Sequence, residues 1–258
     1  MKKRTAFIGA ILSLISLGQP LLIKTGVVLS STGLMIALPE KVNAETSSFY
    51  FNRAYDKAQR GDPYGAISDY TKAIEINPSE GAYYNRGISK NEIKDYYGAI
   101  SDYTKAIEIN PKKDEAYFNR GNSKRKLKDH YGAISDYTKA IEIRPVDDDA
   151  YYNRGNAKSD LKDHYGAISD YTKAIEINPQ FAVAYYNRGL AKSKLKDNYG
   201  AIADYNESIN INSSYVDAYV NSGIVKEKLG DLKGACSDWE KASSLGDKDS
   251  AKWVSNQC

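Results

Sequence analysis

The thirteen residues Tyr-Gly-Ala-Ile-Ser-Asp-Tyr-Thr-Lys-Ala-Ile-Glu-Ile at positions 131–143 decide how this chain folds. The same string stands unchanged at positions 64–76, 97–109 and 165–177. Ile134, Tyr137 and Ile141 follow one another at spacings of three and four residues, so they share one face of a helix, while Asp136 and Lys139 lie on the polar side. The string therefore predicts an amphipathic helix, here called helix B.

The residues around the string predict where helix B begins and ends. Asp129 stands where an N-cap would accept hydrogen bonds from free backbone N–H groups. Arg144 precedes Pro145, and a residue before proline is pushed out of the helical region. A second helix, helix A, is expected from Asp149 to about Lys162 in the next unit.

Gly155 interrupts helix A near its middle, where glycine costs about 1 kcal/mol relative to alanine. We expect a packing reason for this cost. The expected reason is the close approach of helix B, through the small side chains of Ala167 and Ala174.

The whole unit repeats along the chain. The hexapeptide Ala-Tyr-Tyr-Asn-Arg-Gly at 150–155 has close copies in steps of 34 residues, except for one step of 33 after the first copy. The sequence thus predicts six units over residues 49–251, with boundaries at 49–81, 82–115, 116–149, 150–183, 184–217 and 218–251.

These units resemble the tetratricopeptide repeat (TPR) family. The resemblance rests on the aromatic residue early in helix A, the glycine four residues later, and the Ala, Tyr, Ala and Pro of helix B and its loop, as at Tyr117, Ala133, Tyr137, Ala140 and Pro145. The family implies an all-α, right-handed α-solenoid of stacked helix-turn-helix repeats. It also implies that helix A lines a concave groove that binds a peptide or a protein.

Two rows of side chains follow from placing helix A on this groove. One is an asparagine in every repeat, and a carboxamide can both donate and accept a hydrogen bond to an extended peptide; the alternative is hydrogen bonding between helices of the solenoid. The other is an aromatic residue just before each asparagine. The rows comprise Asn52, Asn85, Asn119, Asn153, Asn187 and Asn221, with Phe51, Tyr84, Phe118, Tyr152 and Tyr186.

Helix A departs from the family pattern at two positions, where an arginine and a lysine follow each other at a spacing of four residues. Such a pair repels by a few tenths of a kcal/mol unless an acid intervenes. An aspartate of helix B recurs in the same register, so we expect a structural ion pair in each repeat rather than a ligand site. The residues are Arg86, Arg120, Arg154 and Arg188, Lys90, Lys124, Lys158 and Lys192, and Asp102, Asp136, Asp170 and Asp204.

Residues 1–44 have the composition of an export signal. Three basic residues, at positions 2–4, precede the apolar stretches Ala6–Ile23 and Gly26–Leu38, and Val42 and Ala44 suit cleavage before Glu45. A retained N-terminal membrane anchor and a buried core helix are the alternatives. With the signal or the anchor, the repeats lie outside the cytoplasm, in a periplasm, a lumen or the extracellular space.

The end of the chain differs from the repeats. Residues 247–258 restart the helix-A pattern and are expected to form a capping helix over the last repeat. Cys236 and Cys258 are the only cysteines, so the sequence allows one disulfide in an oxidising compartment or two free thiols.

Charge and motifs exclude several functions. From Glu45 onward, 31 basic residues face 32 acidic ones, so the repeats lack the basic excess of a nucleic-acid-binding protein. His130 and His164 have no metal-ligand partners in sequence, and no catalytic or cofactor motif is present. The sequence predicts a non-enzymatic scaffold for a protein or an extended peptide, which contacts membrane only through an uncleaved N-terminal segment. The alternatives are a structural spacer or self-associating rod, and an enzyme or its regulatory subunit.

Overall fold

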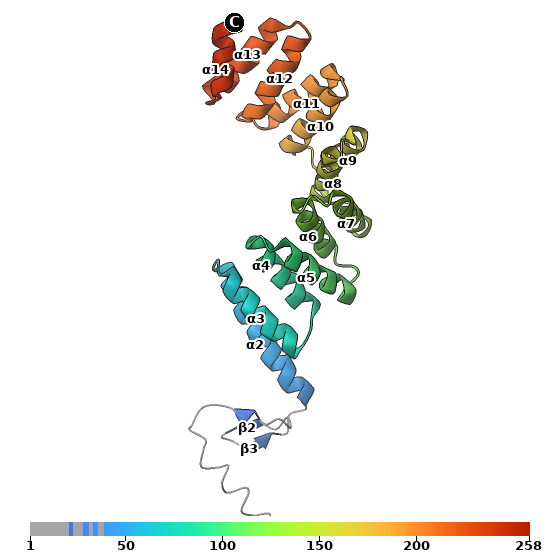
Figure 1. The fold of residues 1–258 in the computed structure, drawn as a ribbon, viewed down its shortest axis with the longest axis vertical. Helices are drawn as coiled ribbons and strands as arrows, with labels where there is room; N and C mark the ends of the chain where they lie inside the picture. The colour runs from blue at the N-terminus through green and yellow to red at the C-terminus, as the bar shows by residue number, and fades with distance from the viewer. Residues whose placement is uncertain (1–20, 23–27, 31–32, 36–38) are drawn as a thin grey trace, which may run out of the picture. The chain divides into compact units, whose positions relative to one another are not determined.

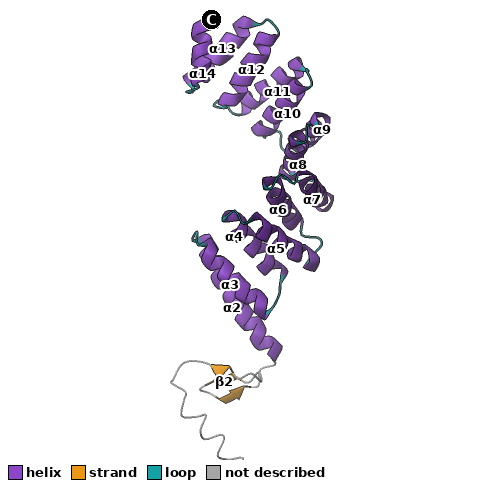
Figure 2. Ribbon diagram, in the orientation of Figure 1, coloured by secondary structure: helices purple, strands orange, loops and turns teal. Residues whose placement is uncertain are grey.

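The structure is a computed structural model that describes residues 21–22, 28–30, 33–35 and 39–258. The chain divides into two compact units, with the boundary in the sequence between Ile93 and Lys94. From residue 39 onward every described element is a helix (Figure 2), which confirms the all-α repeat fold.

Among the described residues, the first unit has three short strands and three helices. The strands β1 (Leu21–Leu22), β2 (Val28–Ser30) and β3 (Gly33–Met35) pair antiparallel in that order. They fall within the segment predicted to be an export signal or anchor, most of which lies outside the described residues. The helices are α2 (Pro39–Gln59), α3 (Pro63–Ile76) and α4 (Glu80–Glu92).

Helix α2 starts ahead of the predicted repeat boundary at residue 49 and runs across the predicted cleavage position before Glu45. The part of α2 before residue 49 also packs against α3, as Ser47 shows. Its side chain is buried, and its hydroxyl donates a 3.0 Å hydrogen bond to the carbonyl oxygen of Ala73 in α3.

The second unit is a stack of ten helices in chain order (Figure 1). Each helix packs against the next, so helices A and B alternate through the unit. In order they are α5 (Tyr96–Ile109), α6 (Asp114–Lys126), α7 (His130–Ile143), α8 (Asp148–Asp160), α9 (His164–Ile177), α10 (Ala182–Lys194), α11 (Asn198–Ile211), α12 (Val216–Lys228), α13 (Leu232–Ser244) and α14 (Lys248–Gln257).

The predicted ends of helix B are confirmed. Asp129 caps α7, because its carboxylate accepts a 2.9 Å hydrogen bond from the backbone N–H of Gly132, and the helix ends at Ile143 before Arg144 and Pro145. Every helix B carries the same cap, at Asp62, Asp95, Asp129, Asp163, Asp197 and Asp231.

The turn from helix A to helix B has a feature that the sequence did not predict. Lys128 adopts a left-handed backbone conformation with a φ of 64°. The N–H of Lys128 bonds to the carbonyl of Arg125, and that of Asp129 to the carbonyl of Lys124, which is the Schellman arrangement at a helix C-terminus. Glycine takes this position in two repeats, at Gly61 and Gly230.

The core lies between helices A and B and contains mainly alanines around one large ring per repeat, with a buried isoleucine of helix B in four repeats. The Tyr137 ring is fully buried with Ala133 and Ala157 around it. The close approach predicted at Gly155 is confirmed, but the partner is not an alanine. A Cβ atom at Gly155 would lie 2.8 Å from Cε1 of Tyr171, so the buried ring of helix B occupies the space that glycine leaves.

At the end of the chain, α14 packs against α13. The Trp253 ring of α14 lies 5.2 Å from the ring of Trp239, which is buried in α13. No helix among the described residues combines the length and the apolar character that a membrane span requires.

Candidate binding surface

The arginine and lysine rows of helix A hold the repeats together. In the second unit, Arg154 of α8 donates from Nε and Nη2 to both carboxylate oxygens of Asp170 in α9, at 2.9 and 2.7 Å. Lys158 reaches the same carboxylate at 2.8 Å. Arg120 with Asp136, and Arg188 with Asp204, repeat this geometry, which confirms the predicted structural ion pair.

The aspartate of this cluster lies deeper than the helical pattern predicted. Asp136 is only 2% exposed, although the sequence places it on the polar side of helix B. A buried carboxylate needs paired charges and hydrogen bonds. The Arg120 and Lys124 side chains supply them, so the polar side of helix B is solvent-exposed only in part.

Each arginine also reaches back to the preceding repeat, a contact that the sequence did not reveal. Nη1 of Arg154 donates a 3.1 Å hydrogen bond to Oγ1 of Thr138 in α7, and its guanidinium lies 5.4 Å from the centre of the Tyr151 ring. One side chain therefore joins two consecutive repeats. The threonine stands at a fixed position of the thirteen-residue string, but nothing in a single repeat indicates that it faces the next one.

The first unit contains the same cluster of arginine, lysine and aspartate, in a repeat for which it was not predicted. Arg53 of α2 donates to both oxygens of Asp69 in α3 at 2.7 and 2.6 Å, and Lys57 lies 2.9 Å from the same carboxylate. The hydrogen bonds from Arg53 hold the pKa of Asp69 well below its usual range, against the opposing effect of burial.

The aromatic row of helix A is half-buried rather than open. Tyr152 packs on Tyr171 of its own repeat and, at 5.0 Å between ring centres, on Phe181 before the next helix A. Tyr186 makes the equivalent contacts with Tyr205 and Tyr215, and burial raises the pKa of Tyr186 to about 12. These contacts make the aromatic row part of the packing between helices.

In three asparagines of the row, the amide group of the side chain bonds within the described fold and the carbonyl oxygen does not. The Nδ2 amide of Asn187 donates to the hydroxyl of Tyr152 at 2.9 Å, and that of Asn221 donates to the hydroxyl of Tyr186 at 3.1 Å. The amide of Asn153 donates at 2.9 Å to the backbone carbonyl of Asp149 in its own helix. Within the described part of the chain, the side-chain carbonyl oxygens of these three asparagines accept no hydrogen bond.

We name the surface that these two rows form in the second unit the helix-A face. It lies on α6, α8, α10 and α12. Its members are half-buried and comprise Phe118, Asn119, Tyr152, Asn153, Tyr186, Asn187 and Asn221. In the first unit, Asn85 and Tyr84 are also half-buried, whereas Asn52 is exposed.

Some of the variation between repeats on helix A compensates for buried groups. The hydroxyl of Tyr171 donates to Oδ1 of Asn156 at 2.9 Å, and the same oxygen lies 3.2 Å from Nδ2 of Asn187. In the next repeat the residue equivalent to Asn156 is Leu190, which follows Gly189 and packs with Tyr205 instead. The change from asparagine to leucine therefore alters both the interior contact and the surface.

Other candidate groups have structural partners. His130 begins α7, and its Nδ1 lies 3.4 Å from Asp160, which also meets Arg125 at 3.2 Å. An acidic cluster at residues 147–149 is tied into the fold, since Asp147 caps α8 and pairs with Arg144.

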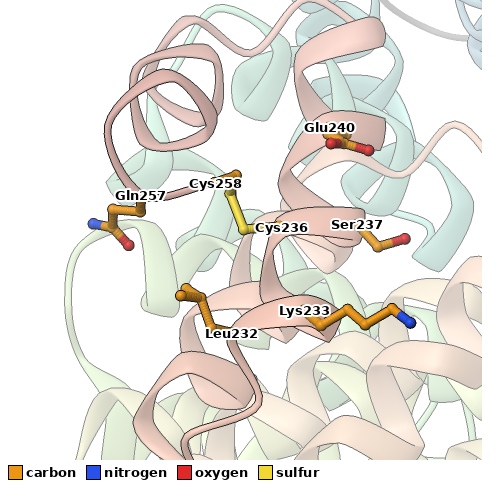
Figure 3. Close-up of a pocket in the computed structure, with 7 residues that line it drawn as sticks. All are labelled: Leu232, Lys233, Cys236, Ser237, Glu240, Gln257 and Cys258. Atoms are coloured by element: carbon orange, nitrogen blue, oxygen red, sulfur yellow. A yellow bond between two sulfur atoms is a disulfide. The ribbon is translucent and has the colours of Figure 1, made fainter.

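The two cysteines, Cys236 of α13 and Cys258 at the chain end, form a disulfide with their Cα atoms 5.8 Å apart. Figure 3 shows this bond beside a shallow pocket of about 510 Å³ that Leu232, Lys233 and Glu240 also line. The bond ties α14 to α13 near the chain end.

Comparison with known proteins agrees with the repeat and the fold. The tetratricopeptide repeat model matches residues 81–113, 114–146 and 148–181, and a second tetratricopeptide repeat model matches residues 170–203. A comparison with curated proteins gave no match.

Several solved structures have similar folds. MamA is 27% identical over 64% of this chain and 96% of its own, with a TM-score of 0.61. YrrB, described as a TPR protein with an unusual peptide-binding site, is 21% identical over 72% of this chain and 97% of its own, with a TM-score of 0.62. PilF of Pseudomonas aeruginosa is 17% identical over 83% and 99%, with a TM-score of 0.67. The repeated sequence, the alternating helix pairs and these matches show that the chain belongs to the tetratricopeptide repeat family.

Proposed function

We propose that this chain is a non-enzymatic scaffold that binds an extended peptide of a partner protein on its helix-A face, outside the cytoplasm. Repeats of this family support protein interaction, and YrrB provides a peptide-binding example of the same fold. We infer the chemical class of the partner from the side chains of the helix-A face.

The observation that carries the proposal is the row of side-chain carbonyl oxygens. Asn153, Asn187 and Asn221 use their amide groups inside the fold, and their carbonyl oxygens accept no hydrogen bond within the described residues. An extended peptide offers backbone N–H groups whatever its side chains are. The face therefore suits a ligand that donates backbone hydrogen bonds, and the half-buried Tyr152 and Tyr186 rings add apolar contact.

The internal bonds make this face rigid before a ligand arrives. The amide of Asn187 is held by Tyr152 from the preceding repeat, so its carbonyl has a fixed direction. A fixed acceptor loses little conformational freedom on binding, and such preorganisation favours affinity.

A phage-displayed library of random twelve-residue peptides, selected on the full-length chain, tests the peptide proposal. We expect enriched peptides to bind Asn153→Ala about two- to tenfold more weakly, because one hydrogen bond is worth about 0.5–1.5 kcal/mol. The amide bond that is also lost lies within α8. Asn198→Ala, on helix B, serves as the control for removing an asparagine elsewhere.

A backbone test separates peptide hydrogen bonding from side-chain contact. Methylating single backbone nitrogens of an enriched peptide removes its N–H donors one at a time, and we expect two or more positions to lose affinity. Equal binding of the methylated peptides and of Asn153→Ala would refute the acceptor row as the binding element.

The location outside the cytoplasm is supported by the composition of residues 1–44 and by a disulfide between the only two cysteines. Intact mass of a C-terminally tagged chain tests it. A mature species beginning at Glu45 in the exported fraction is expected, and a soluble cytosolic species that retains residues 1–44 would contradict it.

A further inference from the structure

The second unit carries a row of tyrosines that its fold does not use. Each stands at the second position of a helix B, one repeat after another. All four are 76–77% exposed, more than any other large apolar or aromatic side chain of this unit. We call them the edge tyrosines: Tyr97, Tyr131, Tyr165 and Tyr199.

The edge tyrosines make no contact that explains their presence. Within the described part of the chain, none has a hydrogen bond, a ring contact or a cation–π contact. The contrast with Tyr137, six residues after Tyr131 in the same helix, is complete, because that ring is fully buried and bonded to Asn122. An aromatic ring left in water loses the contacts that normally reward its size.

The chain's own divergence indicates that these rings are not a passive copy. In α11 the thirteen-residue string has changed at five positions, of which Ala203, Asn206, Glu207 and Asn210 are exposed and Ser208 is buried. The exposed Tyr199 has stayed, together with buried Asp204. Exposed positions of this helix have changed, whereas the exposed Tyr199 has not. This difference indicates that Tyr199 makes a contact outside the described fold.

The charge around the row argues against an anionic partner. Each edge tyrosine follows an exposed lysine and an exposed aspartate in the turn, as Lys128 and Asp129 precede Tyr131. Lys139, further along the same helix, pairs with Glu142. Nucleic acid and anionic lipid both need a positive excess, and this edge has none.

We propose that the edge tyrosines are the contact between two copies of this chain. The four rings recur every 34 residues of the sequence, and a second copy of the chain carries the same row. In a two-fold symmetric contact, the same patch serves both sides. The lysine and aspartate beside each ring are then self-complementary, since either charge can face its opposite across the axis.

The area approaches what such a contact needs. A fully buried aromatic side chain removes about 150–250 Å² from water. Because each edge tyrosine is already about a quarter buried, the four rings supply about 450–750 Å² per copy, against about 800 Å² per partner in a standard interface. Because the edge tyrosines lie on helices B and the helix-A face lies on helices A, the contact uses no residue of the proposed peptide site. A dimer would thus carry two peptide sites, and the proposal stands or falls independently of the peptide.

Sedimentation equilibrium of the full-length chain tests the proposal. We expect a dimer with a dissociation constant in the micromolar range or below, as interfaces of this area show. Tyr131→Ser with Tyr165→Ser should raise that constant at least a hundredfold, because tyrosines are frequent hot spots and each substitution removes a ring from both copies. Val146→Ser, which alters a side chain that is 73% exposed but off the row, is the matched control and should leave the constant unchanged.

Photo-oxidative cross-linking of the unaltered chain supplies a second readout that does not depend on a variant folding. A ruthenium photocatalyst with persulfate couples two touching tyrosines through a carbon–carbon bond. The coupling releases two protons and two electrons, and persulfate accepts the electrons. Mass spectrometry should find edge tyrosines of two copies in the cross-linked peptides. A monomer at concentrations to about 100 μM, well above a micromolar constant, would overturn the proposal, and so would association that the double variant leaves intact.

Discussion

Arg120→Met should destabilise the fold clearly, because Arg120 is the main partner of a buried carboxylate. Its Nε and Nη2 atoms donate to Asp136 at 2.9 and 2.7 Å, and Nη1 donates to Thr104 at 3.0 Å. Methionine fills similar space without these bonds. Asp136 would keep only the contact with Lys124 at 2.8 Å.

The magnitude follows from the burial of the pair. Breaking a buried ion pair by removing one partner costs about 3–5 kcal/mol. Lys124 still compensates part of the charge here, and the arginine side chain is 16% exposed. We therefore expect a loss of about 2–3 kcal/mol in the free energy of unfolding, which with a urea m-value of about 2 kcal/mol/M lowers the unfolding midpoint by about 1–1.5 M.

The assay is urea unfolding followed by circular dichroism, with two companion variants. Arg125→Met removes a more exposed pair, in which Arg125 and Asp160 are 32% and 41% exposed, and should cost about 1 kcal/mol or less. Replacing Arg120, Lys124 and Asp136 together by Met, Met and Leu should recover much of the loss, since no buried charge remains unpaired.

The reasoning is refuted if Arg120→Met and Arg125→Met shift the midpoint equally. It is also refuted if the triple replacement is less stable than Arg120→Met alone. Either result would mean that the repeated cluster on helices A and B adds little to stability and that its regular recurrence has another cause.

Three further predictions concern glycine packing, the turn and the disulfide. Gly155→Ala should destabilise the fold by about 1–2 kcal/mol, because the new Cβ would lie 2.8–3.3 Å from the Tyr171 ring and overpacking outweighs the gain in helix propensity. Lys128→Gly should stabilise it by about 0.5–1 kcal/mol, since its φ of 64° is strained for a residue with a side chain. Both are measured by urea unfolding. Reducing the Cys236–Cys258 bond, which closes a 22-residue separation, should speed hydrogen exchange in α14 and lower stability there by about 3 kcal/mol.

Each of these predictions has an internal comparison. Gly81→Ala meets nothing closer than 3.6 Å and should be neutral or stabilising. Lys126→Gly, in the last turn of α6, should destabilise, because no strain is relieved there. Faster exchange throughout the second unit on reduction, rather than in α14 and α13, would contradict a local role for the disulfide.

The sequence alone determined the local structure. The apolar spacing of Ile134, Tyr137 and Ile141 gave the helix, Asp129 and Pro145 gave its ends, and the 34-residue period gave the stacking of identical units. Each of these signals acts within one or two helical turns, so it can be recognised without knowing what packs against the helix. The pairing of Arg120 with Asp136 was also predictable, because opposite charges recur in the same register.

Only the tertiary structure decided which side chains meet across repeats. Asn187 donates to Tyr152 thirty-five residues away, Arg154 reaches Thr138, and Tyr171 fills the space at Gly155. A period of 34 residues states that neighbouring helices are equivalent but not how far each is rotated or shifted along its axis. That rotation places Asp136 in the interior and Tyr131 in solvent, because it sets which helix faces cover each other when the repeats stack.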